Sequence, residues 1–150
     1  MKKFILAMAA LTFSFGVMSA QDLASATATY NSGAEALTMG NKTSALEYFQ
    51  KALTMAESLG EEGAEVATNC KNAIPSVILS IGKEFYNNKD FTNAKAKFVE
   101  AAEVAKKYGN EEVTAEVEGL LPTVGKRIAL AKGNEAMKNK DIVSVLVGFL

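Results

Sequence analysis

Side chains able to carry out acid–base or nucleophilic chemistry are sparse in this sequence. The 150 residues contain one cysteine, Cys70, and no histidine, so the commonest general base and the commonest metal ligand are both missing. The adjacent carboxylates of Glu61 and Glu62 could act as bases, but no nucleophile with a partner base accompanies them. Two acidic residues at a helix start are also explained by the favourable helix dipole. We therefore expect no enzymatic activity, no catalytic residue, no cofactor and no metal site.

The first 20 residues have the layout of a secretory signal peptide. Lys2 and Lys3 give a positive start, the 15 residues Phe4 to Met18 are almost entirely apolar, and Ser19-Ala20 supplies small residues for a cleavage site. A membrane anchor is the alternative, but this apolar stretch falls short of the roughly 20 residues that span a bilayer. We expect cleavage after Ala20, export of a mature chain of residues 21–150, and no membrane span after cleavage.

The exported part would form one domain without a nucleic-acid partner. With Lys2 and Lys3 removed, 14 basic residues remain against 17 acidic ones, a net charge of −3, which is too mild to indicate binding to nucleic acid. Cys70 is single, so it cannot form an intramolecular disulfide. We favour a buried, inert thiol, and the alternative is an intermolecular disulfide in an oxidising compartment.

One segment of the chain returns 49 residues later. Residues 40–53 are matched by residues 89–102, so that Ala45 and Phe49 correspond to Ala94 and Phe98. Self-similarity at a fixed spacing indicates one supersecondary unit that is copied along the chain and buries its apolar face against its neighbour.

The spacing of apolar residues predicts an all-α fold. Apolar residues recur at helical spacing, and no stretch shows the sustained two-residue alternation of a strand. Pro75 and Pro122 interrupt the two longest helices and should bend each one or split it in two. The expected helices span about Leu23–Met39, Thr43–Leu59, Gly63–Asn87, Phe91–Tyr108 and Glu111–Lys138, with a short sixth helix from Asp141.

Glycines in the middle of expected helices indicate close helix crossings. Gly33, Gly82 and Gly133 occupy such positions, where glycine costs about 1 kcal/mol relative to alanine. We expect each to lie where a neighbouring helix crosses closely. The repeated alanines would supply the matching small surface. The repeated phenylalanines would fill the space between helix pairs, rather than form an aromatic box for a cofactor.

In the order and spacing of these glycines, alanines and phenylalanines, the chain resembles the tetratricopeptide repeat family over roughly residues 27–142. The family pattern places a glycine and an aromatic residue in a first helix, then a short turn, then an Ala, Phe, Ala series in a second helix. The first copy has Gly33, Gly40-Asn41-Lys42, Ala45, Phe49 and Ala52, the second has Gly82, Phe85, Lys89-Asp90-Phe91, Ala94, Phe98 and Ala101, and a third begins with Gly133, Ala136 and Lys140-Asp141-Ile142. The resemblance implies a right-handed α-solenoid of antiparallel helix pairs, with repeats at about 23–59, 63–108 and 111–150, the last incomplete.

The spacing of the copies departs from the family pattern. The intervals of 49 residues from Gly33 to Gly82 and 51 from Gly82 to Gly133 exceed the family period of about 34. The first helices should therefore be unusually long. Long first helices bent near Pro75 and Pro122 resemble those of exported bacterial tetratricopeptide proteins. This resemblance implies that the exported chain lies in the bacterial periplasm or cell envelope.

The last nine residues do not fit the pattern of a second helix. Residues 142–150 are almost wholly apolar, whereas such a helix should be amphipathic. One interpretation is a natural terminus that docks on preceding helices or on a partner. We favour a truncated or frame-shifted end, because solenoids generally finish in a polar-faced cap.

The resemblance implies a non-catalytic scaffold or adaptor of the cell envelope that holds a partner peptide or helix in a concave groove lined by the first helices. Tyrosine and arginine often anchor interfaces, and asparagine can hold a peptide backbone. The side chains expected to face the groove are Tyr30, Asn31, Ala34, Leu37 and Thr38, then Leu79, Lys83, Tyr86 and Asn87, and finally Arg127, Leu130, Asn134 and Lys138. For each of them the alternative is an ordinary solvated helix face. The partner would be another envelope protein or peptide; the alternative function is structural self-association, or a fragment of a longer repeat array.

Overall fold

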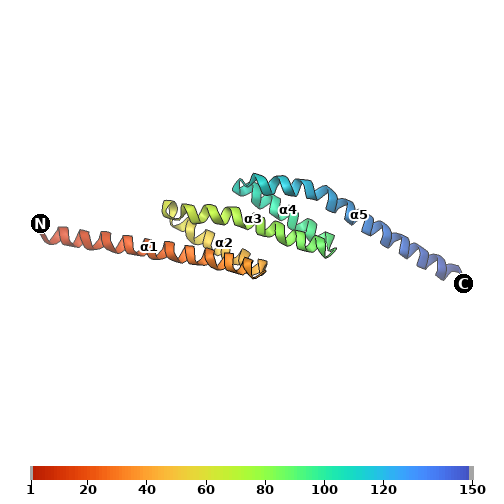
Figure 1. Cartoon of the computed structure of the whole chain (residues 1–150), viewed down its shortest axis with the longest axis horizontal. Helices are drawn as coiled ribbons and strands as arrows, with labels where there is room; N and C mark the ends of the chain where they lie inside the picture. The colour runs from red at the N-terminus through yellow and green to blue at the C-terminus, as the bar shows by residue number, and fades with distance from the viewer. Residues whose placement is uncertain (1, 149–150) are drawn as a thin grey trace. The chain divides into compact units, whose positions relative to one another are not determined.

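Every element of the structure is helical. The computed structural model describes residues 2–148, with side chains described from residue 20 onward except at 144 and 145; residues 1, 149 and 150 lie outside the described part. No described residue belongs to a strand, so the all-α prediction is confirmed. The elements are α1 (Lys2–Thr38), α2 (Lys42–Ser58), the 3₁₀ helix η1 (Gly60–Gly63), α3 (Ala64–Asn87), α4 (Phe91–Tyr108) and α5 (Glu111–Gly148) (Figure 1).

The chain divides into two compact units, Met1–Val77 and Ile78–Leu150, with the boundary inside α3. In the first unit α1 packs along α2, and η1 contacts both helices. In the second unit α4 packs along α5, and the part of α3 in this unit contacts α4. Each unit therefore contains helices that are joined by a short turn and packed side by side.

The turns before α2 and α4 are built in the same way. The Asn41 side-chain oxygen accepts a hydrogen bond from the Ser44 backbone N–H at 3.1 Å, and the Asp90 carboxylate accepts one from the Asn93 N–H at 3.1 Å. Both side chains satisfy a backbone donor that the first turn of a helix leaves without a partner. Gly40, with φ of 79°, closes α1 just before the first of these caps. The repeated sequence thus corresponds to a repeated local structure.

Replacing Asp90 with alanine is expected to destabilise the chain by about 1 kcal/mol, because the Asn93 N–H loses its acceptor at the start of α4. Urea unfolding followed by circular dichroism measures the change. Glu103→Ala, at an exposed position of the same helix, is the control and should shift stability by less than about 0.5 kcal/mol. An Asp90→Ala variant as stable as the parent would show that the cap contributes nothing.

The second helix of each unit buries one face made of alanines around a phenylalanine. The buried residues are Ala45, Phe49, Ala52, Leu53 and Ala56 on α2, and Ala94, Phe98, Ala101, Ala102 and Ala105 on α4. Small side chains let the neighbouring helix approach closely, and the aromatic ring fills the remaining space. The repeated series Ala45, Phe49 and Ala52 and its counterpart Ala94, Phe98 and Ala101 thus lie on the buried faces.

Two of the three mid-helix glycines lie at close helix crossings. A Cβ atom on Gly33 would lie 2.7 Å from Cε1 of Phe49, and one on Gly82 would lie 2.6 Å from Cδ1 of Phe98. The rings therefore lie over glycines of their own helix pair, and filling of the space between pairs stays a prediction. Nothing lies within 4 Å of a Cβ on Gly133, so the prediction of a close crossing is wrong there, because no described helix covers this part of α5.

The helix boundaries differ from prediction at both ends of the chain. Helix α5 continues to Gly148, so the turn at Lys140-Asp141 and the short sixth helix are wrong predictions. A turn at Lys140-Asp141 would be stabilised if the residues after it formed a second helix that buried an apolar face. Residues 142–148 lack the separate polar and apolar faces of α2 and α4, so nothing favours such a turn. Helix α1 extends back to Lys2, through the segment predicted to be a signal peptide, and its cleavage stays a prediction.

The two internal prolines do not divide their helices. Helices α3 and α5 run without interruption through Pro75 and Pro122, so splitting into two helices is ruled out, and Figure 1 shows α5 as a curved helix. Among the described residues, no helix combines the length and the apolar character needed to cross a membrane.

Candidate protein-binding site

The eight side chains singled out for partner binding fall in both units. In the first unit Tyr30, Asn31 and Leu37 lie on α1; in the second unit Lys83, Tyr86 and Asn87 lie on α3, and Arg127 and Asn134 lie on α5.

On α1, packing accounts for the aromatic candidate. The Tyr30 ring lies 5.2 Å from the Phe49 ring at an interplanar angle of 45°, and both Tyr30 and Leu37 are half-buried. Asn31 is exposed. Thr38 is exposed too, but its hydroxyl donates to the Ala34 carbonyl at 3.0 Å within the same helix. Of the three α1 candidates Tyr30, Asn31 and Leu37, Asn31 is therefore the one that is available to a partner.

On α3, two candidates already have partners. Lys83 Nζ lies 2.5 Å from Glu116 Oε1, which links α3 to α5, and the Tyr86 ring packs edge-on against Phe91 at 5.3 Å. Replacing either residue would disturb helix packing as well as any binding. Leu79, also expected in the groove, is only 3% exposed, so that prediction is wrong: the side chain belongs to the packed face one turn before Gly82.

Three polar candidates of the second unit are exposed. Asn87 is the last residue of α3, and Arg127 and Asn134 lie seven residues apart on α5. Seven residues make about two helical turns, so these two side chains share one face of α5. A guanidinium group can bind a carboxylate through two hydrogen bonds, and a carboxamide can both donate to and accept from a peptide backbone.

A depression that sequence reasoning missed lies between α4 and α5. Its volume is about 570 Å³, and it is lined by Thr92, Lys95, Ala96, Val99, Ile128 and Lys132. The lining combines an apolar surface with two ammonium groups, which suits an apolar side chain next to a carboxylate. In the sequence Lys95 resembles an ordinary solvating lysine, and only the packing of α4 on α5 brings Ile128 and Lys132 beside it.

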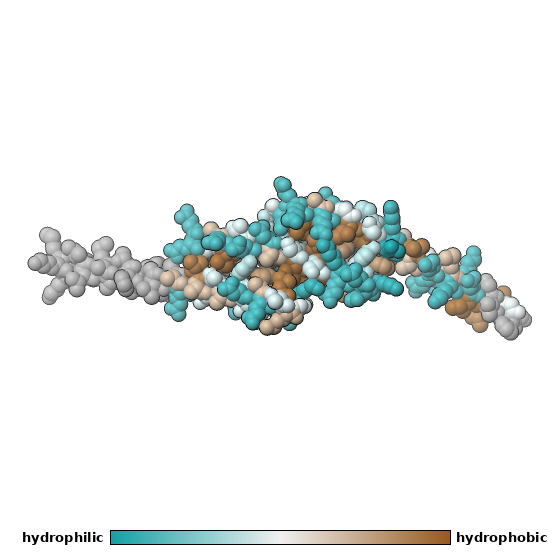
Figure 2. All heavy atoms as spheres, viewed as in Figure 1, coloured by the Kyte–Doolittle hydropathy of each residue, from teal (hydrophilic) through white to brown (hydrophobic). Residues whose placement is uncertain are grey.

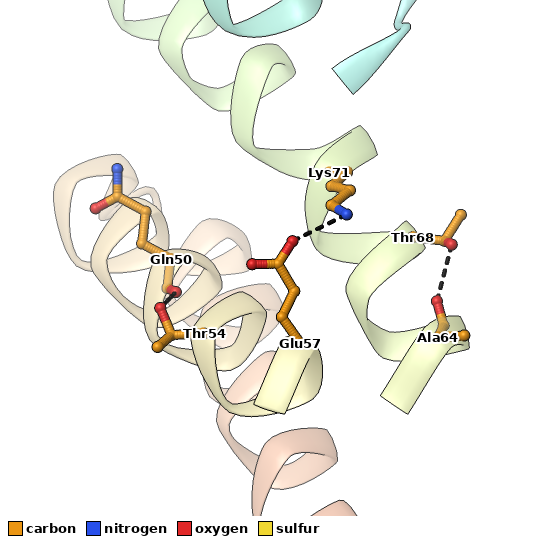
Figure 3. Close-up of polar contacts among 6 residues, drawn as sticks. All are labelled: Gln50, Thr54, Glu57, Ala64, Thr68 and Lys71. Atoms are coloured by element: carbon orange, nitrogen blue, oxygen red, sulfur yellow. Dashed lines mark hydrogen bonds and ion pairs between the residues drawn. The ribbon is translucent and has the colours of Figure 1, made fainter. Parts of the chain in front are cut away.

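One matching position of the two copies carries opposite charges, and each of these charges forms an ion pair with the next α-helix. Figure 3 shows Glu57 of α2 paired with Lys71 of α3, with 2.9 Å between Oε1 and Nζ. At the position 49 residues later, Lys106 of α4 pairs with Glu118 of α5 at 3.1 Å. Exposed pairs of this kind contribute about 0.2–1 kcal/mol each, so they add little to the stability of the helix packing. The nearby Thr54 and Thr68 hydroxyls donate to carbonyls of their own helices.

The single thiol is enclosed by the core. Cys70 is buried, as the favoured interpretation of the sequence predicts. Burial raises the pKa of the Cys70 thiol from 9.0 to about 11. Since the thiolate is the reactive form, the folded chain presents neither an accessible nor an ionised sulfur near neutral pH.

The raised pKa of Cys70 predicts a loss of stability in alkaline solution. The unfolded thiol ionises near 9 and the folded one near 11, so its contribution is complete below pH 9 and is lost as the pH rises through 11. Two pKa units correspond to at most about 3 kcal/mol. Between pH 8 and 11 we expect the parent to lose up to this much more unfolding free energy than the Cys70→Ala variant loses, as measured by urea unfolding. Equal pH dependence of the two proteins would contradict the prediction.

No family model, curated protein or solved structure matches the chain. Among the described residues, no cluster of three or more histidine, cysteine, aspartate or glutamate side chains is placed to hold a metal ion.

Proposed function

We propose that this chain is a non-catalytic protein-interaction scaffold of the bacterial cell envelope, built as a right-handed solenoid of tetratricopeptide-like helix pairs. The observation that carries the proposal is the repeated hairpin. Both copies have the same polar cap and the same phenylalanine ring over a mid-helix glycine. Repeated helix pairs of this kind offer extended helix faces for binding other proteins.

The proposed contact surface in the second unit consists of Asn87, Arg127 and Asn134. All three are exposed and polar, and none of them is needed for the helix contacts described above. Their chemistry favours an extended peptide or a helix that carries a carboxylate for Arg127 and backbone groups for the asparagines. The depression between α4 and α5, with Lys95 and Lys132, would favour an acidic partner in the same way.

The test is crosslinked capture from envelope extract with the tagged full chain and with an Asn87→Ala/Arg127→Glu variant. We expect the parent to capture a specific envelope protein and the variant to lose it, because the variant removes an amide and reverses a charge on the proposed surface. The captured protein is then purified and its binding to both chains is measured directly.

A matched control separates this effect from general changes in charge. Asn69→Ala/Lys51→Glu alters one exposed asparagine and one exposed lysine that lie outside both the Asn87 and Arg127 surface and the depression between α4 and α5. Loss of binding in both variants would show an effect of overall charge and not of the proposed surface. Equal binding by the parent and the Asn87→Ala/Arg127→Glu variant would remove the proposed surface.

The exposed apolar end of α5 favours self-association as a second candidate function. Ile142, Val143, Leu146 and Val147 are 57% to 66% exposed, and Figure 2 shows apolar surface near the C-terminal end of the chain. Burying such side chains between copies would remove them from water. Sedimentation velocity over a hundredfold range of protein concentration tests this candidate, and a mass that stays that of a monomer throughout would exclude it.

A further inference from the structure

Helix α5 has a face that corresponds, position by position, to a covered face of α3. The face of α3 consists of Leu79, Gly82 and Tyr86, and the corresponding residues of α5 are Leu130, Gly133 and Met137. In both helices a leucine lies three residues before the glycine, and a large side chain lies four residues after it. Tyr30, Gly33 and Leu37 have the same spacing on α1. We call the three α5 residues the α5 seat.

The equivalent faces of α1 and α3 are covered by a helix of one kind. On α3, the ring of Phe98 lies against Gly82, and Leu79 is 3% exposed. On α1, the ring of Phe49 lies against Gly33. Each covering helix carries an alanine four residues before its phenylalanine, and both alanines are buried. The element that fits such a face is therefore an amphipathic helix with an alanine and a phenylalanine four residues apart.

The α5 seat is uncovered in the structure. Leu130 is 58% exposed, Met137 is 61% exposed, and nothing lies within 4 Å of a Cβ on Gly133. The described end of the same chain cannot cover it in this conformation. Gly148 lies 15 residues further along one continuous helix, and at 1.5 Å per residue this places it roughly 22 Å away.

The charges around the α5 seat indicate what kind of helix would bind. Residues 126–141 contain five basic and two acidic side chains, and Lys126, Arg127 and Lys138 among them are exposed. A partner helix with acidic side chains beside its apolar face would be attracted to this surface, whereas a basic one would be repelled.

We propose that the α5 seat binds an acidic amphipathic helix of another protein, which lies antiparallel to α5 and places a phenylalanine over Gly133. The contact copies the one that Phe98 makes with Gly82 inside this chain. It completes a third helix pair in trans. The three residues of the seat differ from Asn87, Arg127 and Asn134, although Arg127 contributes positive charge beside both. Gly133→Leu changes the seat without removing that charge, and Asn87→Ala changes the other surface without touching the seat, so the two proposals can be tested separately.

A synthetic helix taken from the chain itself provides the probe. The peptide comprises residues 41–58, which include the cap and helix α2, with Lys42 and Lys51 both changed to glutamate to make it acidic. A fluorescent label at its N-terminus reports binding to the full chain by anisotropy at low and at physiological salt. We expect saturable binding that weakens with salt, and at least tenfold weaker binding by a peptide that also carries Phe49→Ala.

Protein variants place the peptide on the chain. Gly133→Leu fills the α5 seat and should weaken binding at least tenfold, while Gly119→Leu, at an exposed glycine of the same helix with open space around it, should leave binding unchanged. The proposal is overturned by absence of peptide binding, by equal binding to Gly133→Leu, or by equal binding of the Phe49→Ala peptide. Binding that emerges only after removal of residues 142–150 would identify this chain's own tail as the occupant. Peptide binding that dissociates a parent dimer would identify a second copy of the chain as the occupant. Either result contradicts the proposal that another protein occupies the seat.

Discussion

Replacing Gly63 with alanine is expected to destabilise the chain by about 3 kcal/mol, the upper end of the usual cost of overpacking. A Cβ atom at this buried position would lie 2.0 Å from the Ala56 carbonyl oxygen and 2.7 Å from its carbonyl carbon. Both are backbone atoms of α2, so no rotation of a side chain can relieve the clash. Helix α2 and the 3₁₀ helix η1 must separate, and the midpoint of urea unfolding measures the loss.

Gly119→Ala is the control for the Gly63 prediction. Gly119 lies inside α5 with nothing within 4 Å of a Cβ, so alanine there should stabilise the chain by about 0.5–1 kcal/mol through its better helix propensity. The two substitutions are chemically identical and are expected to have opposite signs. A Gly63→Ala variant as stable as the parent would contradict the close approach of η1 to α2.

The joint that contains Gly63 shows what the sequence can and cannot predict. Residues 60–63 and 109–112 look equivalent in sequence, since each group begins with a glycine after a helix. In the structure Gly63 is buried in η1, whereas Glu112, at the matching position, is exposed in the first turn of α5. Periodicity and caps predict helices locally. The contact between Gly63 and Ala56 depends on how α2 meets η1, which no local pattern encodes.

The candidate site was predictable only as a set of helix faces. Helical spacing correctly leaves Asn87 and Arg127 exposed, but it cannot tell a side chain that faces solvent from one that reaches a neighbouring helix. Tyr86 and Lys83 both lie on that boundary, and the structure gives them Phe91 and Glu116 as partners. Their roles depend on the distance between helices, which residue types alone do not fix.

The contrast between Gly82 and Gly133 follows the same logic. Both glycines fit the repeat pattern, and the sequence predicts a close crossing at each. The crossing exists at Gly82 because α4 returns along α3 after a turn, and it is missing at Gly133 because α5 continues without one. A glycine in a repeat pattern thus predicts a close crossing only where the next helix folds back.

The second large effect is expected at the crossing of α3 and α4. Phe98 is fully buried with its ring against Gly82, so Phe98→Ala should cost about 3–5 kcal/mol by removing the ring and leaving a cavity. Gly82→Ala should cost about 1–3 kcal/mol, because the new methyl group would lie 2.6 Å from Cδ1 of Phe98 and force the ring to move. Urea unfolding of the two variants measures both losses.

A double-mutant cycle shows whether the two effects arise from one contact. Phe98→Leu removes most of the ring, so the methyl group of Gly82→Ala should be accommodated more easily in that background. The Gly82→Ala/Phe98→Leu variant is then expected to be less destabilised than the sum of the single changes, by about 0.5 kcal/mol or more. Gly133→Ala, which touches nothing within 4 Å, should instead combine additively with Phe98→Leu. Additivity in both cycles would mean that Gly82 is not placed in α3 for the sake of the Phe98 ring, and the repeated glycine would lose its explanation as the receiving surface of a helix pair.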